Sequence, residues 1–477
     1  EAFAKLTPED WLLLHSVKGN PEKDQLLYTD LLLAKVEFPK LLESALSIAS
    51  GVDVARPLLL KGISKMDNHS LEFELETPIG LVVIGGPADN IYTKDALLLV
   101  DLGGNDVHAH TAGSSEWVKS GISLTIDCGG SDLYITRRNY AQGAGVFGVG
   151  MLVDLAGDDY YNDTNSRMEF GQGSAFAGVG LLWDDGGNDH FYADSYSQGA
   201  AHIGIGLLVK NGGNDFYSAL TASEGFASNL GLGMLIDKGG NDSYIANDLY
   251  PDDIRGKMDY SNFCQGAGHG NRTVVYPTKK EGIGMAGGIG MLIDFSGNDS
   301  YSAGGFAQGT AYWDALGMLV DVSGDDSYRA TEYAQGGCVH LAAAGQFDFG
   351  GNDSYRNLAS ITLGTGKDYS IGIHIDTSGD DNYDALEHSM GMIMGGGLGL
   401  FIDGSGNDAY KMFTHYPGFA DINAYGGAEQ NSQYAAGIFL DLSGNDSYKT
   451  VKPVSGIDTG NGKTWSQGKL SIAVDKP

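Results

Sequence analysis

Short runs of alternating glycine and apolar residues recur along most of the chain, and each run ends in an aspartate. Examples are GVGMLVD, which ends at Asp154, and GGIGMLID, which ends at Asp294. A polar turn of the type GGND or SGND follows, and then a second short segment that contains a tyrosine. Runs of about 4 to 6 residues between glycine turns are typical of β-strands. The pattern therefore predicts a strand, a turn, a second strand and a polar corner in every unit.

The eight-residue motif D-x-x-G-[N/D]-D-x-Y occurs twelve times, and nine of the eleven intervals between copies are 26 to 30 residues long. We number the motif from its first residue, position 0, so that its second aspartate is position 5 and its tyrosine position 7. Blades of WD40 and kelch proteins need about 40 to 50 residues, and helical repeats lack this glycine content. The spacing predicts an all-β parallel β-helix, a solenoid of about 12 to 13 coils with about 27 residues per coil. The twelve residues at position 0 are Asp101, Asp127, Asp154, Asp184, Lys210, Asp237, Asp294, Asp321, Asp348, Asp376, Asp403 and Asp441.

The ends of the chain lack this motif. In residues 1–75, Thr7 is a candidate N-cap, Pro8 follows at the first helical position, and residues 24–49 have helical spacing. We therefore expect an α-helical N-terminal cap over 1–75, the β-helix over 76–448, and a C-terminal cap or tail over 449–477. Two insertions, about 247–282 and 411–434, interrupt the regular spacing.

Composition narrows the class of protein. The formal net charge is −32, which argues against nucleic acid or an anionic membrane surface as partner. The three cysteines lie far apart, so neither a disulfide framework nor a zinc knuckle is indicated. No apolar run is long enough for a membrane span. This acidic, cysteine-poor composition favours an extracytoplasmic protein, whether secreted, periplasmic or on the cell surface.

Two rows of carboxylates follow from the repeat. Position 5 is aspartate in all twelve units and position 0 in eleven, with Lys210 as the exception. Stacked coils bring equivalent charges within about 4.8 Å, where they repel by roughly 3.5 kcal/mol at an effective dielectric of 20. Either Ca²⁺, which prefers oxygen ligands, or backbone N–H groups of the turns would offset this repulsion. Both alternatives stay open, and the candidate metal ligands are Asp237, Asp242, Asp294, Asp299, Asp321, Asp326, Asp348 and Asp353.

The GGND turns resemble the glycine-rich calcium repeats of RTX proteins, whose units read G-x-G-N-D-x-L. The resemblance covers only the eight-residue turns and implies calcium as a cofactor. RTX units recur every nine residues, whereas one turn occurs per 27 residues here, so their calcium-sandwiching geometry is not implied. The fold as a whole resembles the right-handed parallel β-helix superfamily, which includes many polysaccharide lyases and hydrolases. No specific family is matched.

Departures from the repeat indicate where chemistry would lie. The first part of the first insertion and all of the second leave the solenoid at the same corner. They would form two walls of a groove, whose floor is the four coils that begin between 294 and 376. In these coils the corner glutamine of the A-Q-G triplet is replaced, at 362 by threonine and at 390 by methionine. Candidate catalytic residues in this groove are Glu332, Glu387, His388 and Arg356. Candidate substrate-binding residues are Arg329, Tyr333, Arg255, His269, Arg272 and His415.

Two functions agree with these features. The first is a secreted or cell-surface structural and binding solenoid, stabilised by cations and recognising carbohydrate or a surface partner. The alternative is a polysaccharide lyase or glycoside hydrolase that acts in the groove, where carboxylates, histidine and arginine would supply acid–base chemistry. The regular repetition favours the first function.

Overall fold

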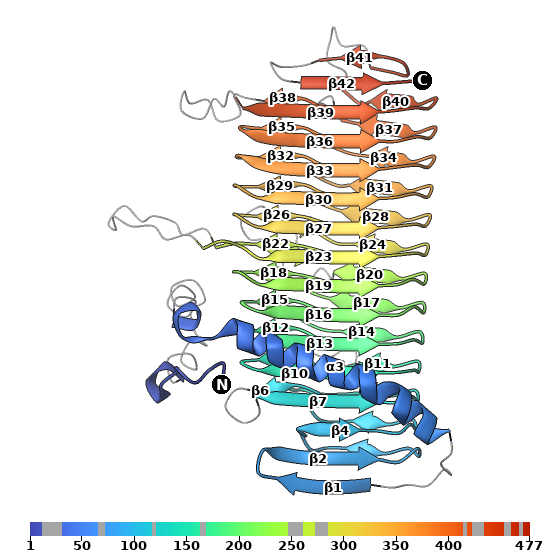
Figure 1. Cartoon of the computed structure of the whole chain (residues 1–477). Coiled ribbons are helices and arrows are strands. Elements are labelled where there is room, and N and C mark those ends of the chain that lie inside the picture. Colours follow the sequence, from blue (N-terminus) through green and yellow to red (C-terminus); the bar gives the residue numbers. More distant parts are fainter. Residues whose placement is uncertain are drawn as a thin grey trace.

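The computed structural model describes residues 1–11, 31–64, 72–116, 121–162, 168–246, 261–271, 285–413, 417–421, 434–452, 459–466 and 471–477. It confirms the predicted architecture: the chain is an all-β parallel solenoid of about 11 turns with about 27 residues per turn. The coils stack in chain order from β2 to β42 (Figure 1). Each complete turn contributes one strand to each of three sheets, which we call A, B and C.

Sheet A has 16 described strands. In spatial order they are β1 (Glu72–Thr77), β2 (Gly80–Gly85), β4 (Leu98–Val100), β7 (Ile122–Asp127), β10 (Val149–Asp154), β13 (Val179–Asp184), β16 (Ile205–Lys210), β19 (Leu232–Asp237), β23 (Ile289–Asp294), β27 (Leu316–Asp321), β30 (Ala343–Asp348), β33 (Ser370–Asp376), β36 (Gly397–Asp403), β39 (Ala435–Asp441), β42 (Ser471–Asp475) and β41 (Thr464–Trp465). From β7 to β39 these strands are the glycine–apolar runs of the sequence, and position 0 is their last residue.

Sheet B has 13 described strands, which carry position 7. They are β3 (Ile91–Tyr92), β5 (Val107–His108), β8 (Leu133–Tyr134), β11 (Tyr160–Tyr161), β14 (His190–Tyr192), β17 (Phe216–Ala219), β20 (Ser243–Ala246), β24 (Ser300–Ser302), β28 (Ser327–Ala330), β31 (Ser354–Asn357), β34 (Asn382–Asp384), β37 (Ala409–Met412) and β40 (Ser447–Thr450).

Sheet C has 11 described strands, so the first and last units add to sheets A and B only. They are β6 (Ser115–Glu116), β9 (Gly145–Val146), β12 (Ala175–Phe176), β15 (Ala201–His202), β18 (Ala227–Ser228), β22 (Gly268–His269), β26 (Ala311–Tyr312), β29 (Cys338–Val339), β32 (Gly366–Lys367), β35 (Ile393–Met394) and β38 (Ala420–Asp421). A separate pair, β21 (Ser261–Cys264) and β25 (Gly305–Ala307), lies where the first insertion rejoins the coil.

The register between coils is constant, so equivalent positions form straight columns. Asp237 pairs with Asp294 although 57 residues separate them, so the additional residues of the first insertion leave the register between β19 and β23 unchanged. Position 3 is glycine because its backbone passes very close to the previous coil. At Gly351, where φ is 155°, a Cβ atom would lie 1.4 Å from the carbonyl oxygen of Gly324. The columns are therefore a direct product of the repeat.

The interior is filled by the tyrosines of position 7. Their rings stack face to face along the solenoid, with centroids 4.8 Å apart between Tyr217 and Tyr244 and again between Tyr244 and Tyr301. Leucines of sheet A, such as Leu235 and Leu292, pack against this stack. The hydroxyl groups of the tyrosines point to the position 0 carboxylates, which makes the core partly polar.

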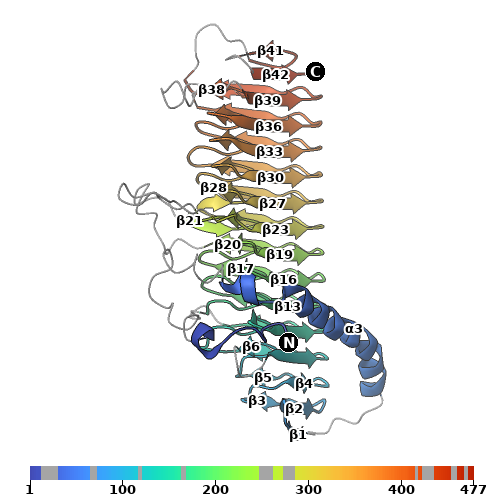
Figure 2. The ribbon, with the colours of Figure 1, turned by 60° about the vertical axis from the view of Figure 1, so that its left-hand side comes forward.

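Both ends carry structure outside the repeat. The helix α3 (Phe38–Ile63) lies along the side of the solenoid against the outward face of sheet A, over β10 and β13 (Figures 1 and 2). Leu41 and Ala45 of the helix pack with Met151, and β10 is buried on both faces as a result. The strand β1 pairs antiparallel with β2, and β41 pairs antiparallel with β42. Among the described helices, none has the length and apolarity that crossing a membrane requires.

Candidate functional site

The position 0 aspartates close the turns and hold the tyrosine stack. In the coil that begins at Asp321, one carboxylate oxygen, Oδ1, accepts the backbone N–H of Ser323 at 3.2 Å. The other, Oδ2, accepts the hydroxyl of Tyr301 from the preceding coil at 2.7 Å. Asp237 and Asp294 accept the same two kinds of hydrogen bond. The expectation that turn N–H groups bind these carboxylates is therefore correct for one oxygen of each.

The position 5 aspartates form a second column that runs through the solenoid. Each Oδ1 accepts the backbone N–H of the position 5 residue in the preceding coil. Asp326 accepts from Asp299 at 2.6 Å, and Asp353 accepts from Asp326 at 2.7 Å. The series continues from Asp106 to Asp446, and every member is buried. Half of the oxygens in this column thus serve as backbone acceptors.

The second oxygen of the position 5 aspartates has no such partner. Ten of these buried Oδ2 atoms have no hydrogen-bond partner in the described part of the chain: those of Asp106, Asp132, Asp159, Asp215, Asp242, Asp299, Asp326, Asp353, Asp381 and Asp408. Burial is the main reason that the pKa of Asp326 rises to about 9, and the charge of Asp321 adds to the rise. The same two causes, burial first and then Asp348, raise the pKa of Asp353 to about 10. With the pKa raised this far, the side chains of Asp326 and Asp353 hold protons at neutral pH in the metal-free chain, and a bound cation would take the place of those protons.

The two columns come together inside the solenoid. Carboxylate oxygens of Asp215, Asp237 and Asp242 lie within 4.8 Å of one another, and those of Asp242, Asp294 and Asp299 do the same. Four of the eight predicted metal ligands, Asp237, Asp242, Asp294 and Asp299, lie in these two groups, and the other four, Asp321, Asp326, Asp348 and Asp353, occupy the same two positions in later coils. The structure thus brings the predicted ligands together as interior oxygen cages.

Lys210, the exception at position 0, places an ammonium group inside such a cage. Its side chain is fully buried, and its ammonium nitrogen, Nζ, lies 2.6 Å from Asp189 Oδ2, 3.0 Å from Asp184 Oδ1 and 3.8 Å from Asp215 Oδ2. Nζ also donates to the carbonyl oxygens of Gly187 and Gly212, at 3.2 and 2.9 Å. Five oxygens therefore surround one positive charge in the only described unit that has a lysine at position 0.

The partner of this lysine is also an exception. In a regular coil the tyrosine hydroxyl of position 7 donates to the position 0 aspartate of the next coil. The residue of position 7 before Lys210 is Phe191, which stacks between Tyr161 and Tyr217 at 4.6 and 4.8 Å but has no hydroxyl. Donor and acceptor are thus replaced together, so that no polar group of this pair is left without a partner.

The predicted catalytic residues do not gather at one point. Glu332 and Glu387 lie at the same corner with one coil between them, so their backbones are about 10 Å apart. Arg329 and Arg356 are neighbours on the outward face of sheet B, in register with Asp384. These arginines are exposed. They lie on a sheet face, whereas the glutamates lie at the corner that follows it.

The other predicted groove residues take several places. Tyr333 is buried and stacks on Phe306 at 4.7 Å. His269 is in β22 and stacks on Tyr312 at 5.5 Å, and burial lowers its pKa to about 4. His388 and Glu387 are partly buried at the corner after β34. Arg255, Arg272 and His415 lie outside the described residues, as do most of the two insertions that would form the groove walls.

The corner glutamines bond to the interior backbone, as Gln308 shows with bonds to the carbonyls of Tyr301 and Arg329 at 3.1 Å each. We expected Thr362 to take the place of the corner glutamine in its coil, but the residue at that position is the next one along the chain. Gly364 N–H bonds to the Gln335 carbonyl, so Leu363 takes the glutamine position in that coil.

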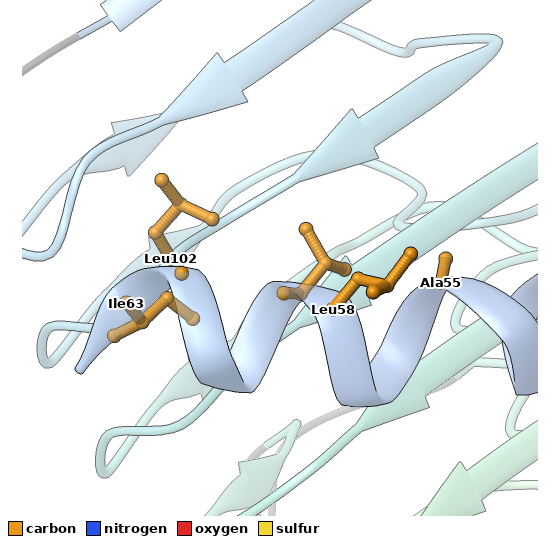
Figure 3. A pocket seen from close by; sticks show the side chains of 6 residues that line it. Ala55, Leu58, Ile63 and Leu102 are labelled. Carbon is orange, nitrogen blue, oxygen red and sulfur yellow. The ribbon is translucent and has the colours of Figure 1, made fainter. Parts of the chain in front are cut away.

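An apolar pocket of about 430 Å³ lies at the N-terminal end, between the last turns of α3 and the first coil (Figure 3). Its lining is apolar, with Leu58, Ile63 and Leu102 around it, and it offers no polar group for catalysis.

Sequence reasoning missed two members of the columns. Asp475 of β42 is in register with Asp441, although the C-terminal segment lacks the G-N-D turn. His108 takes position 7 in the first unit and approaches Asp127. The signal for His108 was visible, because the motif there reads DLGGNDVH.

Three comparisons were made, with protein-family models, with curated proteins and with solved structures, and none of them gave a match to this chain.

Proposed function

We propose that this chain is a structural and binding solenoid whose coils are held together by hard cations, with Ca²⁺ as the ion that fits best. The ions would lie between the position 0 and position 5 columns. The observation that carries the proposal is the buried ammonium of Lys210, which lies among carboxylate and carbonyl oxygens at 2.6 to 3.2 Å. Where lysine is absent, the equivalent oxygens remain and the positive charge does not.

The donor set supports calcium in particular. Ca²⁺ takes six to eight oxygen ligands from carboxylates and backbone carbonyls, in flexible geometry. Each cage offers carboxylates from two coils, and in the coil of Lys210 the turn carbonyls of Gly187 and Gly212 lie beside them. The unpartnered Oδ2 atoms are buried, so water does not compensate the negative charge that these carboxylates carry once they lose their protons. The resemblance of the GGND turns to RTX calcium repeats points the same way.

The outer face of sheet B supports a binding role. In three successive coils, Tyr160, His190 and Phe216 occupy a column that is serine in β20, β24, β28 and β31. The Tyr160 ring is 46% exposed and stacks on His190 at 4.6 Å. Amphipathic aromatic rings on a surface suit contact with ligands that are apolar on one face and polar at the edge. Sugar rings are such ligands, and carbohydrate is therefore the partner that we propose.

The test compares the chain with and without calcium. We expect calcium to co-purify, as measured by mass spectrometry of the metal content, and a chelator to lower the melting temperature. Free calcium at 100 times the dissociation constant adds about 2.7 kcal/mol per site to the free energy of unfolding. Magnesium, which demands a smaller octahedral site, serves as the control and should restore less stability. A calcium-free chain whose melting temperature does not respond to calcium would contradict the proposal.

A further inference from the structure

The first complete unit has a different residue at position 7. His108 replaces the tyrosine of the other coils and is fully buried, with its ring stacked between Tyr92 at 5.0 Å and Tyr134 at 4.4 Å. It therefore fills the space of a tyrosine ring but brings a nitrogen, in place of a hydroxyl, to the interior carboxylates.

Three metal-ligating groups converge around this nitrogen. His108 Nε2 lies 3.0 Å from Asp127 Oδ2, and ligand atoms of Asp106, His108 and Asp127 all lie within 4.8 Å of one another. Asp106 is 1% exposed, and its Oδ1 accepts the N–H of Asn90. Its Oδ2 is buried without a hydrogen-bond partner in the described structure. A cage that already carries one unpartnered carboxylate oxygen thus gains an imidazole.

We propose that Asp106, His108 and Asp127 form a transition-metal site at the N-terminal end of the columns, with Zn²⁺ as the fitting ion. Calcium takes oxygen ligands, whereas one imidazole nitrogen with two carboxylates is a donor set that zinc accepts. The site rests on the cation-binding function proposed above, since Asp127 also belongs to the next cage with Asp132 and Asp154. The site differs from the proposed calcium cages in the class of metal that it would bind, zinc in place of calcium.

A second histidine orients the first. His108 Nδ1 lies 3.3 Å from His110 Nε2, and His110 Nδ1 accepts the N–H of Ala112 at 3.2 Å. Without metal, the protons therefore lie on Nε2 of both rings, and His108 donates to Asp127. With metal on His108 Nε2, each ring moves its proton to Nδ1, and His108 then donates to His110. This tautomer change leaves one proton on each ring; the metal replaces the hydrogen bond from His108 to Asp127, and the bond from Ala112 to His110 is given up. The hydrogen bond from His108 Nδ1 to His110 Nε2 then orients the metal-bound ring, as outer-shell partners of metal-bound histidine usually do.

The experiment uses the full chain and the variant His108→Tyr, which restores the residue that stacks in the other coils. Both proteins are equilibrated with Zn²⁺ and Ca²⁺ together, separated from free ions and analysed for metal content. We expect one zinc per chain in the original protein and none in the variant, with equal calcium in both. Co²⁺ gives a second readout, because the original protein should show visible ligand-field absorption that the variant lacks.

Asp106→Asn provides a second variant, because its amide oxygen still accepts the N–H of Asn90 while the charge is lost. It should bind zinc at least tenfold more weakly, which is the effect expected from losing one charged ligand. Zinc bound equally by His108→Tyr, or not bound by the original protein, would overturn the proposal. If neither protein binds calcium but the original protein still binds zinc, the proposed calcium function is wrong and the zinc site is supported.

Discussion

Replacing Lys210 with aspartate gives this coil the residue that the other eleven units carry at position 0. The buried ammonium lies 2.6 Å from Asp189 and 3.0 Å from Asp184, and each pair gains about 6 kcal/mol of Coulomb energy at an effective dielectric of 20. The cost of desolvating the ions offsets much of this gain. Removing one partner of a buried ion pair nevertheless costs about 3–5 kcal/mol, because the other charges stay buried. We expect at least that loss of unfolding free energy in Lys210→Asp when a chelator is present.

Calcium should reverse part of this loss, because the variant cage then has the composition of its neighbours. The expected gain is about 2.7 kcal/mol when free calcium is 100 times the dissociation constant, with one more calcium bound per chain. Denaturant titrations followed by circular dichroism, with calcium and with chelator, measure the first quantity, and metal analysis measures the second. Lys238→Asp is the matched control, since Lys238 is exposed beside Asp237 and its ammonium lies 5.2 Å from the centre of the Trp183 ring. The same charge change there should alter stability by about 1 kcal/mol or less.

A second substitution, Phe191→Tyr, tests whether the aspartate introduced at position 210 behaves like that of a regular coil. Its ring already stacks with the neighbouring tyrosines, so the added hydroxyl should reach an aspartate at 210 as Tyr217 reaches Asp237 at 2.6 Å. In a double-mutant cycle, Phe191→Tyr and Lys210→Asp should therefore couple favourably by about 0.5–3 kcal/mol. The reasoning is refuted if Lys210→Asp binds no additional calcium and is equally stable in calcium and in chelator.

Three further predictions address the columns and the turns. Asp326→Asn keeps the acceptor for Asp299 N–H and removes a buried acid that the metal-free chain must keep protonated, so its melting temperature should rise in chelator and gain less from calcium than that of the original protein. Burial raises the pKa of Asp326 from 3.8 to about 9, so the folded metal-free chain holds protons that the unfolded chain has lost. Its melting temperature should therefore fall as pH rises from about 5 to 9, and calcium should suppress that fall; a fall of equal size in calcium would exclude metal from the column. Gly351→Ala forces a Cβ against Gly324 and should cost about 1–3 kcal/mol or more, whereas Gly51→Ala, which meets no atom within 4 Å on α3, should gain up to about 1 kcal/mol; equal thermal shifts would contradict this difference.

The repeat in the sequence was sufficient to predict the coil length, the parallel stack and the two carboxylate columns. These three features follow from the constant repeat length, because coils of equal length stack in a constant register. A constant register places equivalent residues of successive coils in one column. The repeat was not sufficient to predict which oxygen of Asp326 takes the N–H of Asp299, because that depends on how the turn tilts its carboxylate toward the preceding coil. The repeat also did not predict that α3 lies against the outward face of sheet A. The apolar positions of the helix indicate that it packs on the solenoid, but they do not indicate which sheet it contacts.

The groove residues show a different limit. Glu332 and Arg356 are close in the sequence, but a sheet face and a corner separate them in the coil. Spacing along the chain says little about contact when each coil turns through three sheets. His108 was overlooked for a different reason, because it departs from the motif at an end of the repeat, where no tyrosine marks position 7.

The undisturbed pairing of Asp237 with Asp294 across 57 residues has a consequence for how such a chain can change in length. Each coil of the regular type offers its neighbours the same hydrogen bonds, ring contacts and carboxylates, so such a coil can be duplicated or removed as a cassette without a new interface. The stretch from Asp321 to Phe347 is one such cassette, since its removal would place Asp348 beside Asp294 in the register that Asp321 now holds. Genes of this kind can grow and shrink by unequal recombination between their own repeats, while loops at the corners acquire new sequences independently of the stack.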